Sequence, residues 1–174
     1  MRAAQGPSGR SHAPAPGPAD PDSVAAAEDV ALRILAAAAQ SEAGLRRRLQ
    51  GRGFSEEAAA SATAAMVNHG YVDDGSLAQS IAARSQRTGH GRIRVAAELR
   101  ARGVDDGAIS QTLSDVDPEA ERTAALALGR RLAHSPARAI TDRQGRLRLG
   151  GAMQRRGFDH ETVAWVLREL EREG

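Results

Sequence analysis

One short pattern occurs three times in the chain, and this repetition constrains the fold more than any other feature. The copies are LQGRGFS (49–55), LRARGVD (99–105) and MQRRGFD (153–159), roughly 50 residues apart. In each copy a glycine stands where a helix can end in a left-handed conformation, which only glycine adopts without penalty. An apolar residue follows, and then Ser or Asp, which are good N-caps for a new helix. Each copy therefore predicts a tight corner between two helices, and three copies predict a helical array.

Apolar residues recur at helical spacing on both sides of these corners, and no alternating strand pattern appears. We expect the second corner-like turn, Gly70-Tyr71, to bury its apolar residue as the other corners do. In the helix after Gly91 we expect Ile93 to face inward. Asp117-Pro118 is a strong helix start. Nine helices are predicted; they begin near Val24, Ser41, Ser55, Asp73, Gly91, Asp105, Asp117, Thr141 and Asp159.

The corners divide these helices into three units of three. The predicted units are residues 23–71, 72–116 and 117–174, and each is small enough that it should depend on packing against its neighbours. The predicted fold class is all-α, an elongated tandem array of three three-helix repeats. Residues 1–22 hold most of the prolines and almost no large apolar side chain, which predicts a disordered N-terminal tail.

Composition argues against several classes of function. The chain has no cysteine, which excludes a disulfide framework and a thiolate zinc site and fits a reducing compartment. The five histidines lack metal-ligand spacing, and neither a nucleophile elbow nor a phosphate-cradling loop is present. No segment approaches the roughly 20 apolar residues of a membrane span, nor the apolar core of a signal peptide. We therefore expect a cytoplasmic, non-enzymatic, monomeric chain with no cofactor, no metal, no catalytic residue and no membrane contact.

Every one of the 24 basic residues is an arginine, which can contact phosphate or carboxylate groups in a planar, bidentate way. Since the net charge is only +2, an argument for binding must rest on local clusters. The densest cluster contains a single acid, Glu98. The candidate partner-binding residues are its six arginines, Arg84, Arg87, Arg92, Arg94, Arg100 and Arg102. Weaker candidates are Arg46, Arg47 and Arg48, and a third cluster of Arg143, Arg146, Arg148, Arg155 and Arg156.

Two interpretations of the middle cluster remain open. It can lie along a phosphate backbone or an acidic protein groove, or it can be a solvated helix face balanced by neighbouring acids. The chain has only four aromatic residues, so stacking on bases is not favoured. Direct binding to nucleic acid is therefore expected to be weak and sensitive to salt.

Three longer motifs resemble the RecX family: GYVDDxxLA (70–78), GxGRIRxxxELRARGV (89–104) and RRGFDxxxVxxVL (155–167). The resemblance extends over about residues 24–170. It implies tandem three-helix repeats that bind the RecA protein, chiefly its filament on single-stranded DNA. It further implies inhibition of RecA ATPase, strand-exchange and coprotease activities, and so modulation of homologous recombination, DNA repair and the SOS response. The chain departs from the family pattern at AAAAQS (36–41), at Leu77 and at Gly150-Gly151.

The alternative is an arginine-rich helical-repeat scaffold that binds nucleic acid or another protein independently of RecA. The sequence does not eliminate it. Measurements with single-stranded DNA, with and without RecA, separate the two hypotheses.

Overall fold

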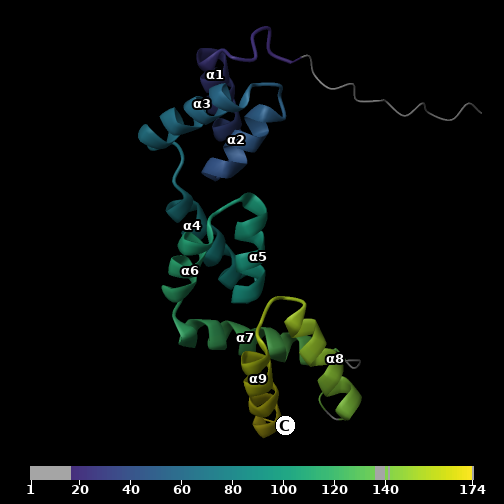
Figure 1. Cartoon of the computed structure of the whole chain (residues 1–174). Helices are drawn as coiled ribbons and strands as arrows, with labels where there is room; N and C mark the ends of the chain where they lie inside the picture. Colours follow the sequence, from purple (N-terminus) through teal and green to yellow (C-terminus); the bar gives the residue numbers. More distant parts are fainter. Residues whose placement is uncertain (1–16, 136–139, 141, 174) are drawn as a thin grey trace, which may run out of the picture.

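The structure is a computed structural model that describes residues 17–135, 140 and 142–173 (Figure 1). Over these residues the regular secondary structure is all helix, with no strand, as predicted. Residues 1–16 of the predicted tail and positions 136–139 and 141 of the loop before the eighth helix lie outside the described residues. The helices are α1 (Val24–Ala37), α2 (Glu42–Gln50), α3 (Glu56–Asn68), α4 (Asp74–Arg87), α5 (Arg92–Arg102), α6 (Asp106–Ser114), α7 (Pro118–Ala133), α8 (Arg143–Gln154) and α9 (His160–Glu173).

The helices follow one another as three bundles in a row, so the molecule is elongated (Figure 1). Each bundle has its own apolar core, because its members pack mainly on each other. In the first bundle, Ala27 and Ala31 of α1 are fully buried beside Ala59 and Ala62 of α3. Small alanine side chains allow these helices to approach closely, so a small bundle can be filled with few aromatic residues. The predicted tandem array of three-helix repeats is confirmed.

The three corners have the predicted backbone conformation. Gly53, Gly103 and Gly157 have φ values of 95°, 87° and 86°. The apolar residues that follow them are buried, and the N-cap side chains that come next accept hydrogen bonds from the first turns of α3, α6 and α9. Each corner thus ends one helix, fixes an apolar side chain and starts the next helix, in three residues.

Two predicted inward-facing residues are exposed instead. Tyr71 is 60% exposed, and Val72 occupies the core in its place. The amides of both residues donate to the Met66 carbonyl, whereas at the other corners the amide of the buried residue directly after the glycine makes this bond. Ile93 is 55% exposed because α5 buries Val95, and two residues correspond to a rotation of about 200° around a helix.

The last residues of the predicted tail have a defined course against the first corner. The amide of Ser55 donates to the Pro21 carbonyl over 2.9 Å, and the Pro18 ring lies next to Gly53. This contact brings the segment before α1 to the start of α3.

The second and third corners also join the units to one another. The Arg102 carbonyl accepts hydrogen bonds from the hydroxyl of Ser41, the N-cap of α2, and, over 3.2 Å, from the guanidinium of Arg47 in the last turn of α2. The carbonyls of Arg156 and Gly157 accept from the amides of Gly91 and Ile93 over 2.9 and 3.0 Å, at the start of α5. Each of these two corners therefore docks on the middle helix of the preceding unit.

The two joints differ in what surrounds these bonds. At the second joint, Arg92 forms an ion pair of 2.8 Å with Glu121 of α7, whose side chain is only 10% exposed. At the first joint, the amide of Glu42 donates to the Asp74 carboxylate over 2.9 Å. Burial raises the pKa of Asp74, and the nearby charges of Glu42 and Asp105 raise it further, although the bond from the Glu42 amide lowers it. The first joint thus contains the acids Glu42, Asp74 and Asp105 as well as the arginines Arg47 and Arg102.

Replacing Ser41 by alanine should destabilise the first unit by about 2 kcal/mol, because the hydroxyl is both an N-cap and a link between units. Ser41 is 1% exposed and accepts from the Gly44 amide over 3.0 Å while it donates to Arg102. The matched control is Ser55→Ala, which removes only a cap within the first unit. Urea unfolding followed by circular dichroism measures both losses. Equal losses would show that the bond across the joint contributes nothing.

Candidate functional site: an arginine ridge

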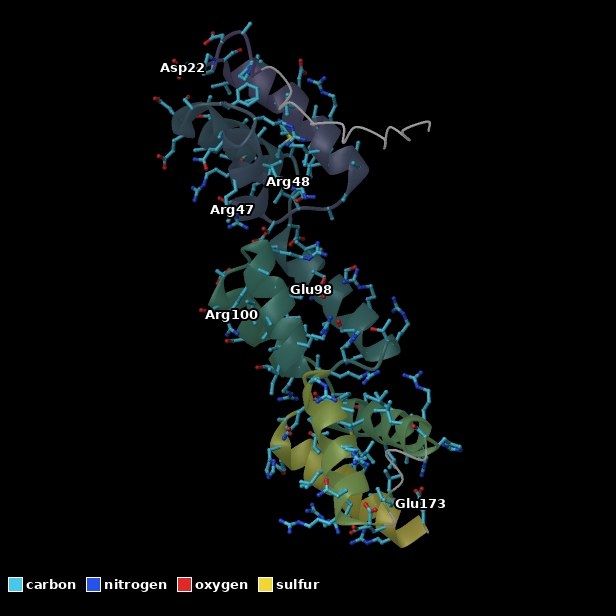
Figure 2. The ribbon with its side chains drawn as sticks, turned by 90° about the vertical axis from the view of Figure 1, so that its right-hand side faces the viewer. Asp22, Arg47, Arg48, Glu98, Arg100 and Glu173 are labelled. Atoms are coloured by element: carbon cyan, nitrogen blue, oxygen red, sulfur yellow. The ribbon has the colours of Figure 1, made fainter. Side chains whose placement is uncertain are left out.

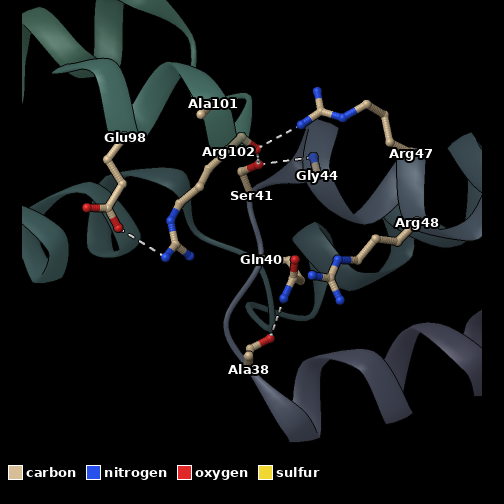
Figure 3. Close-up of a pocket in the computed structure, with 9 residues that line it drawn as sticks. All are labelled: Ala38, Gln40, Ser41, Gly44, Arg47, Arg48, Glu98, Ala101 and Arg102. Atoms are coloured by element: carbon tan, nitrogen blue, oxygen red, sulfur yellow. Dashed lines mark hydrogen bonds and ion pairs between the residues drawn. The ribbon is translucent and has the colours of Figure 1, made fainter. Parts of the chain in front are cut away.

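A pocket of about 660 Å³ opens at the joint between the first two units (Figure 3). Its cationic lining comes from Arg47 and Arg48 of α2 and from Arg102 of α5, and Glu98 is the one acid among the described residues that line it. Arg47 is held by its bond to the Arg102 carbonyl. Arg48 is exposed and forms no ion pair with a described residue. The joint therefore presents several guanidinium groups around one accessible hollow.

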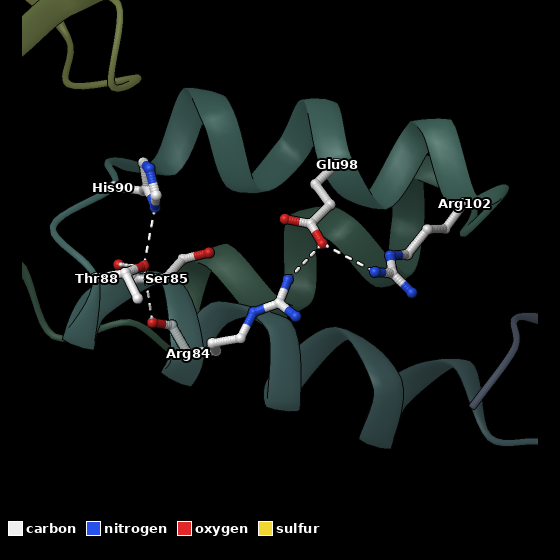
Figure 4. A network of polar contacts seen from close by, with 6 residues as sticks. All are labelled: Arg84, Ser85, Thr88, His90, Glu98 and Arg102. Carbon is white, nitrogen blue, oxygen red and sulfur yellow. Dashed lines mark hydrogen bonds and ion pairs between the residues drawn. The ribbon is translucent and has the colours of Figure 1, made fainter. Parts of the chain in front are cut away.

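Glu98 connects this pocket to the middle of the second unit (Figure 4). One of its carboxylate oxygens accepts from Arg84 of α4 over 2.6 Å and from Arg102 over 3.1 Å. Burial raises the pKa of Glu98, but the hydrogen bonds and charges of these two arginines outweigh that effect and lower the pKa below its ordinary value. Glu98 is thus ionised at neutral pH, and it holds two arginines side by side while it balances the charge of only one.

His90 extends the same positive region to the third unit. Its Nδ1 lies 2.9 Å from the Thr88 hydroxyl. Burial and the charges of Arg94, Arg156 and Arg84 lower the pKa of His90, against the opposing effect of Glu98. Arg156 reaches this place because its carbonyl accepts from Gly91 at the second joint. Burial is the largest of these causes, and the charges of arginines from the second and third units add to it.

The pocket, the shared Glu98 and the charges around His90 link arginines from all three units, and we call this set the arginine ridge. Figure 2 shows Arg47 and Arg48 in the first unit, next to the middle unit that carries Glu98. Arginine side chains in this arrangement suit a long, multiply charged anion better than a small molecule, because they are spread across two joints. The ridge consists of Arg47, Arg48, Arg84, Arg94, Arg102 and Arg156.

The structure brings together only part of the predicted middle cluster. Arg84, Arg94 and Arg102 lie on the ridge. Arg92 is tied to Glu121, and Arg100 forms an exposed ion pair of 2.8 Å with Asp106. Arg87 is exposed at the end of α4, without an ion pair to any described residue.

The weaker candidates also separate. Arg47, Arg48 and Arg156 lie on the ridge, whereas Arg46 and Arg155 are exposed elsewhere on α2 and at the end of α8. In the third unit, Arg146 pairs with Glu171 of α9, and Arg143 and Arg148 are exposed.

Sequence reasoning missed how the acids are distributed. The segment from Arg84 to Arg102 contains one acid, but Glu121 and Asp106 reach two of its arginines from outside. Asp106 follows a predicted N-cap and was detectable. Glu121 lies 29 positions from its partner and reaches it only through the second joint.

Among the described residues no group of three His, Cys, Asp or Glu side chains could hold a metal ion. None of the described helices is long and apolar enough to cross a membrane. The geometry suits binding of an anionic surface.

Comparison with known proteins places this fold in a family. A protein of Mycobacterium sp. (strain KMS), named regulatory protein RecX, is 36% identical to the chain over 159 residues, which are 85% of each chain. The chain belongs to the RecX family. A regulatory protein RecX of Stenotrophomonas maltophilia (strain K279a) is 30% identical over 133 residues, 76% of this chain and 80% of its own.

The RecX family models match the first two units. Residues 27–64 match the RecX first three-helix domain, and residues 73–113 match the RecX second three-helix domain. The crystal structure of RecX from Lactobacillus salivarius has a TM-score of 0.77 to this chain, covering 85% of it and 96% of that chain, at 15% identity. A second crystal structure, of a regulatory protein RecX, has a TM-score of 0.72 at 19% identity. These two similarities support the fold, and the resemblance inferred from the motifs is confirmed.

Proposed function

We propose that this RecX-family chain is a non-enzymatic regulator that binds RecA, chiefly the RecA filament on single-stranded DNA. By binding, it inhibits the ATPase, strand-exchange and coprotease activities of RecA, and so modulates homologous recombination, DNA repair and the SOS response. We propose that it does so in the cytoplasm, as a monomer, with three-helix units at residues 23–71, 72–116 and 117–174.

The observation that carries this proposal is the course of the arginine ridge. It receives arginines from all three units, so binding energy comes from both joints and from the middle unit between them. A filament offers a surface of matching character, because DNA phosphates and protein carboxylates repeat along it. Elongated arrays use such extended surfaces to contact long partners.

The ridge also explains why binding to bare DNA should be the weaker interaction. Arg84 and Arg102 already share Glu98, which offsets part of their attraction for phosphate. Binding to phosphates alone depends on counterion release and falls steeply with salt. The four aromatic residues of the chain offer little stacking, since Phe54 and Phe158 are buried and Trp165 packs beside the third core, which leaves Tyr71 as a single exposed ring. Most of the affinity is therefore expected from protein contacts.

Added well below the RecA concentration, the chain should slow DNA-dependent ATP hydrolysis and strand exchange by RecA. One bound molecule that blocks a filament end or loosens a segment affects many RecA subunits, so a ratio of about one to ten should be enough for clear inhibition. A steady-state ATPase assay on single-stranded DNA measures the effect, with DNA-free RecA as the control. Unchanged ATPase activity at equimolar chain would contradict the proposal.

The alternative function, a scaffold that binds independently of RecA, gives a different pattern. Its supporting observation is the same ridge, which can contact any phosphate backbone. Tight binding of bare DNA without an effect on RecA would favour this alternative.

A further inference from the structure

The helix α8 contains two adjacent glycines, Gly150 and Gly151, near its middle. Glycine is the poorest helix former apart from proline, so it persists inside helices where something requires it. Elsewhere in this chain the requirement is visible. A Cβ atom on Gly91 would lie 2.4 Å from the Gly157 carbonyl oxygen, and one on Gly129 would lie 2.5 Å from a methyl group of Val166. Those glycines permit close internal packing.

No such requirement applies to the glycine pair of α8. A Cβ on Gly150 would lie 3.5 Å from a methyl group of Val163, which is ordinary van der Waals contact. A Cβ on Gly151 would meet only the end of the flexible Arg155 side chain, at 3.4 Å. Neither glycine has a positive φ. Alanine would fit at both positions, so the fold itself does not require the pair.

The glycines instead form part of the floor of a groove between α8 and α9. The groove has a volume of about 380 Å³ and lies in the third unit, at the yellow end of the chain (Figure 1). Leu147 lines the groove, and 60% of its surface is exposed. Positions 147, 150, 151 and 154 of α8 and 160, 163, 164 and 167 of α9 follow helical spacing, so each helix presents one face to the groove. The floor residues are Leu147, Gly150, Gly151, Val163, Ala164 and Leu167.

The rim of the groove is cationic and polar. Arg143, Arg146, Gln154 and His160 line it. Arg146 pairs with Glu171, whereas Arg143 has no ion pair with any residue that the structure describes. An apolar floor with an arginine at one end complements an apolar segment flanked by acids. None of the described residues that line the groove is aromatic, so this lining lacks the stacking surface that binds nucleotide bases.

We propose that this groove docks an amphipathic helix of a partner protein, with apolar residues against the glycine floor and acidic residues toward Arg143. Gly150 is buried against α9, but Gly151 is partly exposed, and its lack of a side chain lets a second helix backbone approach closely, as small residues do at helix contacts. This inference rests on the proposed function, under which the partner is RecA in its filament. The third unit then contacts the RecA protein, while the arginine ridge also contacts DNA phosphates.

The test is Gly151→Gln, which extends a side chain over the groove floor. Glutamine is a better helix former than glycine, so the melting temperature should rise by about 2 °C. Affinity for the RecA filament on single-stranded DNA, measured by fluorescence anisotropy of the labelled chain, should fall at least about tenfold. The matched control is Ala127→Gln, at an exposed position of α7 outside the groove, which should leave the affinity unchanged. Greater stability combined with weaker binding is a result that damage to the fold cannot produce.

A second variant, Leu147→Gln, removes the exposed apolar side chain and should weaken filament binding without lowering the melting temperature. If the parent chain binds the filament and both variants bind equally well, the groove is not a docking site and the proposed function still stands. If the parent chain does not bind the filament, the proposed function fails, and this inference fails with it. If Gly151→Gln lowers affinity for bare single-stranded DNA as much as for the filament, the groove holds nucleic acid, which also overturns the inference.

Discussion

Gly157→Val should reduce the free energy of unfolding by roughly 4 kcal/mol and the melting temperature by about 10 °C. Gly157 has φ +86°, a conformation that β-branched residues rarely adopt. A Cβ atom there would also lie 2.4 Å from the backbone nitrogen of Arg94 and 2.5 Å from its Cβ atom. Valine would therefore strain the corner and push it away from α5, breaking the second joint.

The matched control for this variant is Gly70→Val. Gly70 has a similar φ of +74°, but a Cβ atom on it would meet nothing within 4 Å. The free energy of unfolding of this control should fall only by the backbone strain, about 1 to 2 kcal/mol. The free energy of unfolding of both variants is measured by urea denaturation followed by circular dichroism. The difference between the two values gives the contribution of the second joint to stability. If both variants lose the same stability, the third corner does not hold the second and third units together.

Reversing two charges on the arginine ridge, Arg48→Glu with Arg94→Glu, should weaken inhibition of RecA by about tenfold to a hundredfold. Both side chains are exposed, and neither has an ion pair with a described residue, so the melting temperature should change little. They belong to different units, so the variant interrupts the ridge at both joints. On bare single-stranded DNA, the slope of log affinity against log salt should become shallower by about 1.4, since two phosphate contacts are lost.

The control for the ridge variant is Arg131→Glu with Arg168→Glu. Both arginines are exposed on the third unit, outside the ridge, and the change in net charge is the same. A general electrostatic effect would weaken inhibition equally in both double variants. Full inhibition by a folded ridge variant would show that the ridge is a solvated surface.

The fold was predictable because its determinants are local. Gly103, for example, stands between a helical stripe and an N-cap, and the backbone conformation that it adopts depends on those neighbours alone. The two errors, at Tyr71 and Ile93, each concern which residue of a helix end faces the core. That choice depends on where the helix begins or ends, which varies by a residue or two.

The candidate site was less predictable, because its partners are distant in sequence. Arg92 and Arg94 are neighbours with the same residue type, and nothing near them reveals that one is paired and the other is not. Arg92 meets Glu121 only because the second joint brings α7 to the start of α5. Arg156 adjoins Arg94 for the same reason. Clustering along the sequence therefore found most members of the ridge but could not separate contact residues from structural ones.

The inequality of the two joints has a mechanical consequence. At the second joint two backbones meet directly, and a partly buried ion pair joins α5 to α7, so units two and three should turn as one stiff body. At the first joint the links run through the side chains of Ser41, Arg47 and Asp74 beside an open pocket, and such links rotate at little cost. Bending strain on the array should therefore concentrate at this hinge. The first unit can rotate relative to the second and third units, which would let one molecule follow a curved surface without distorting any of its three cores.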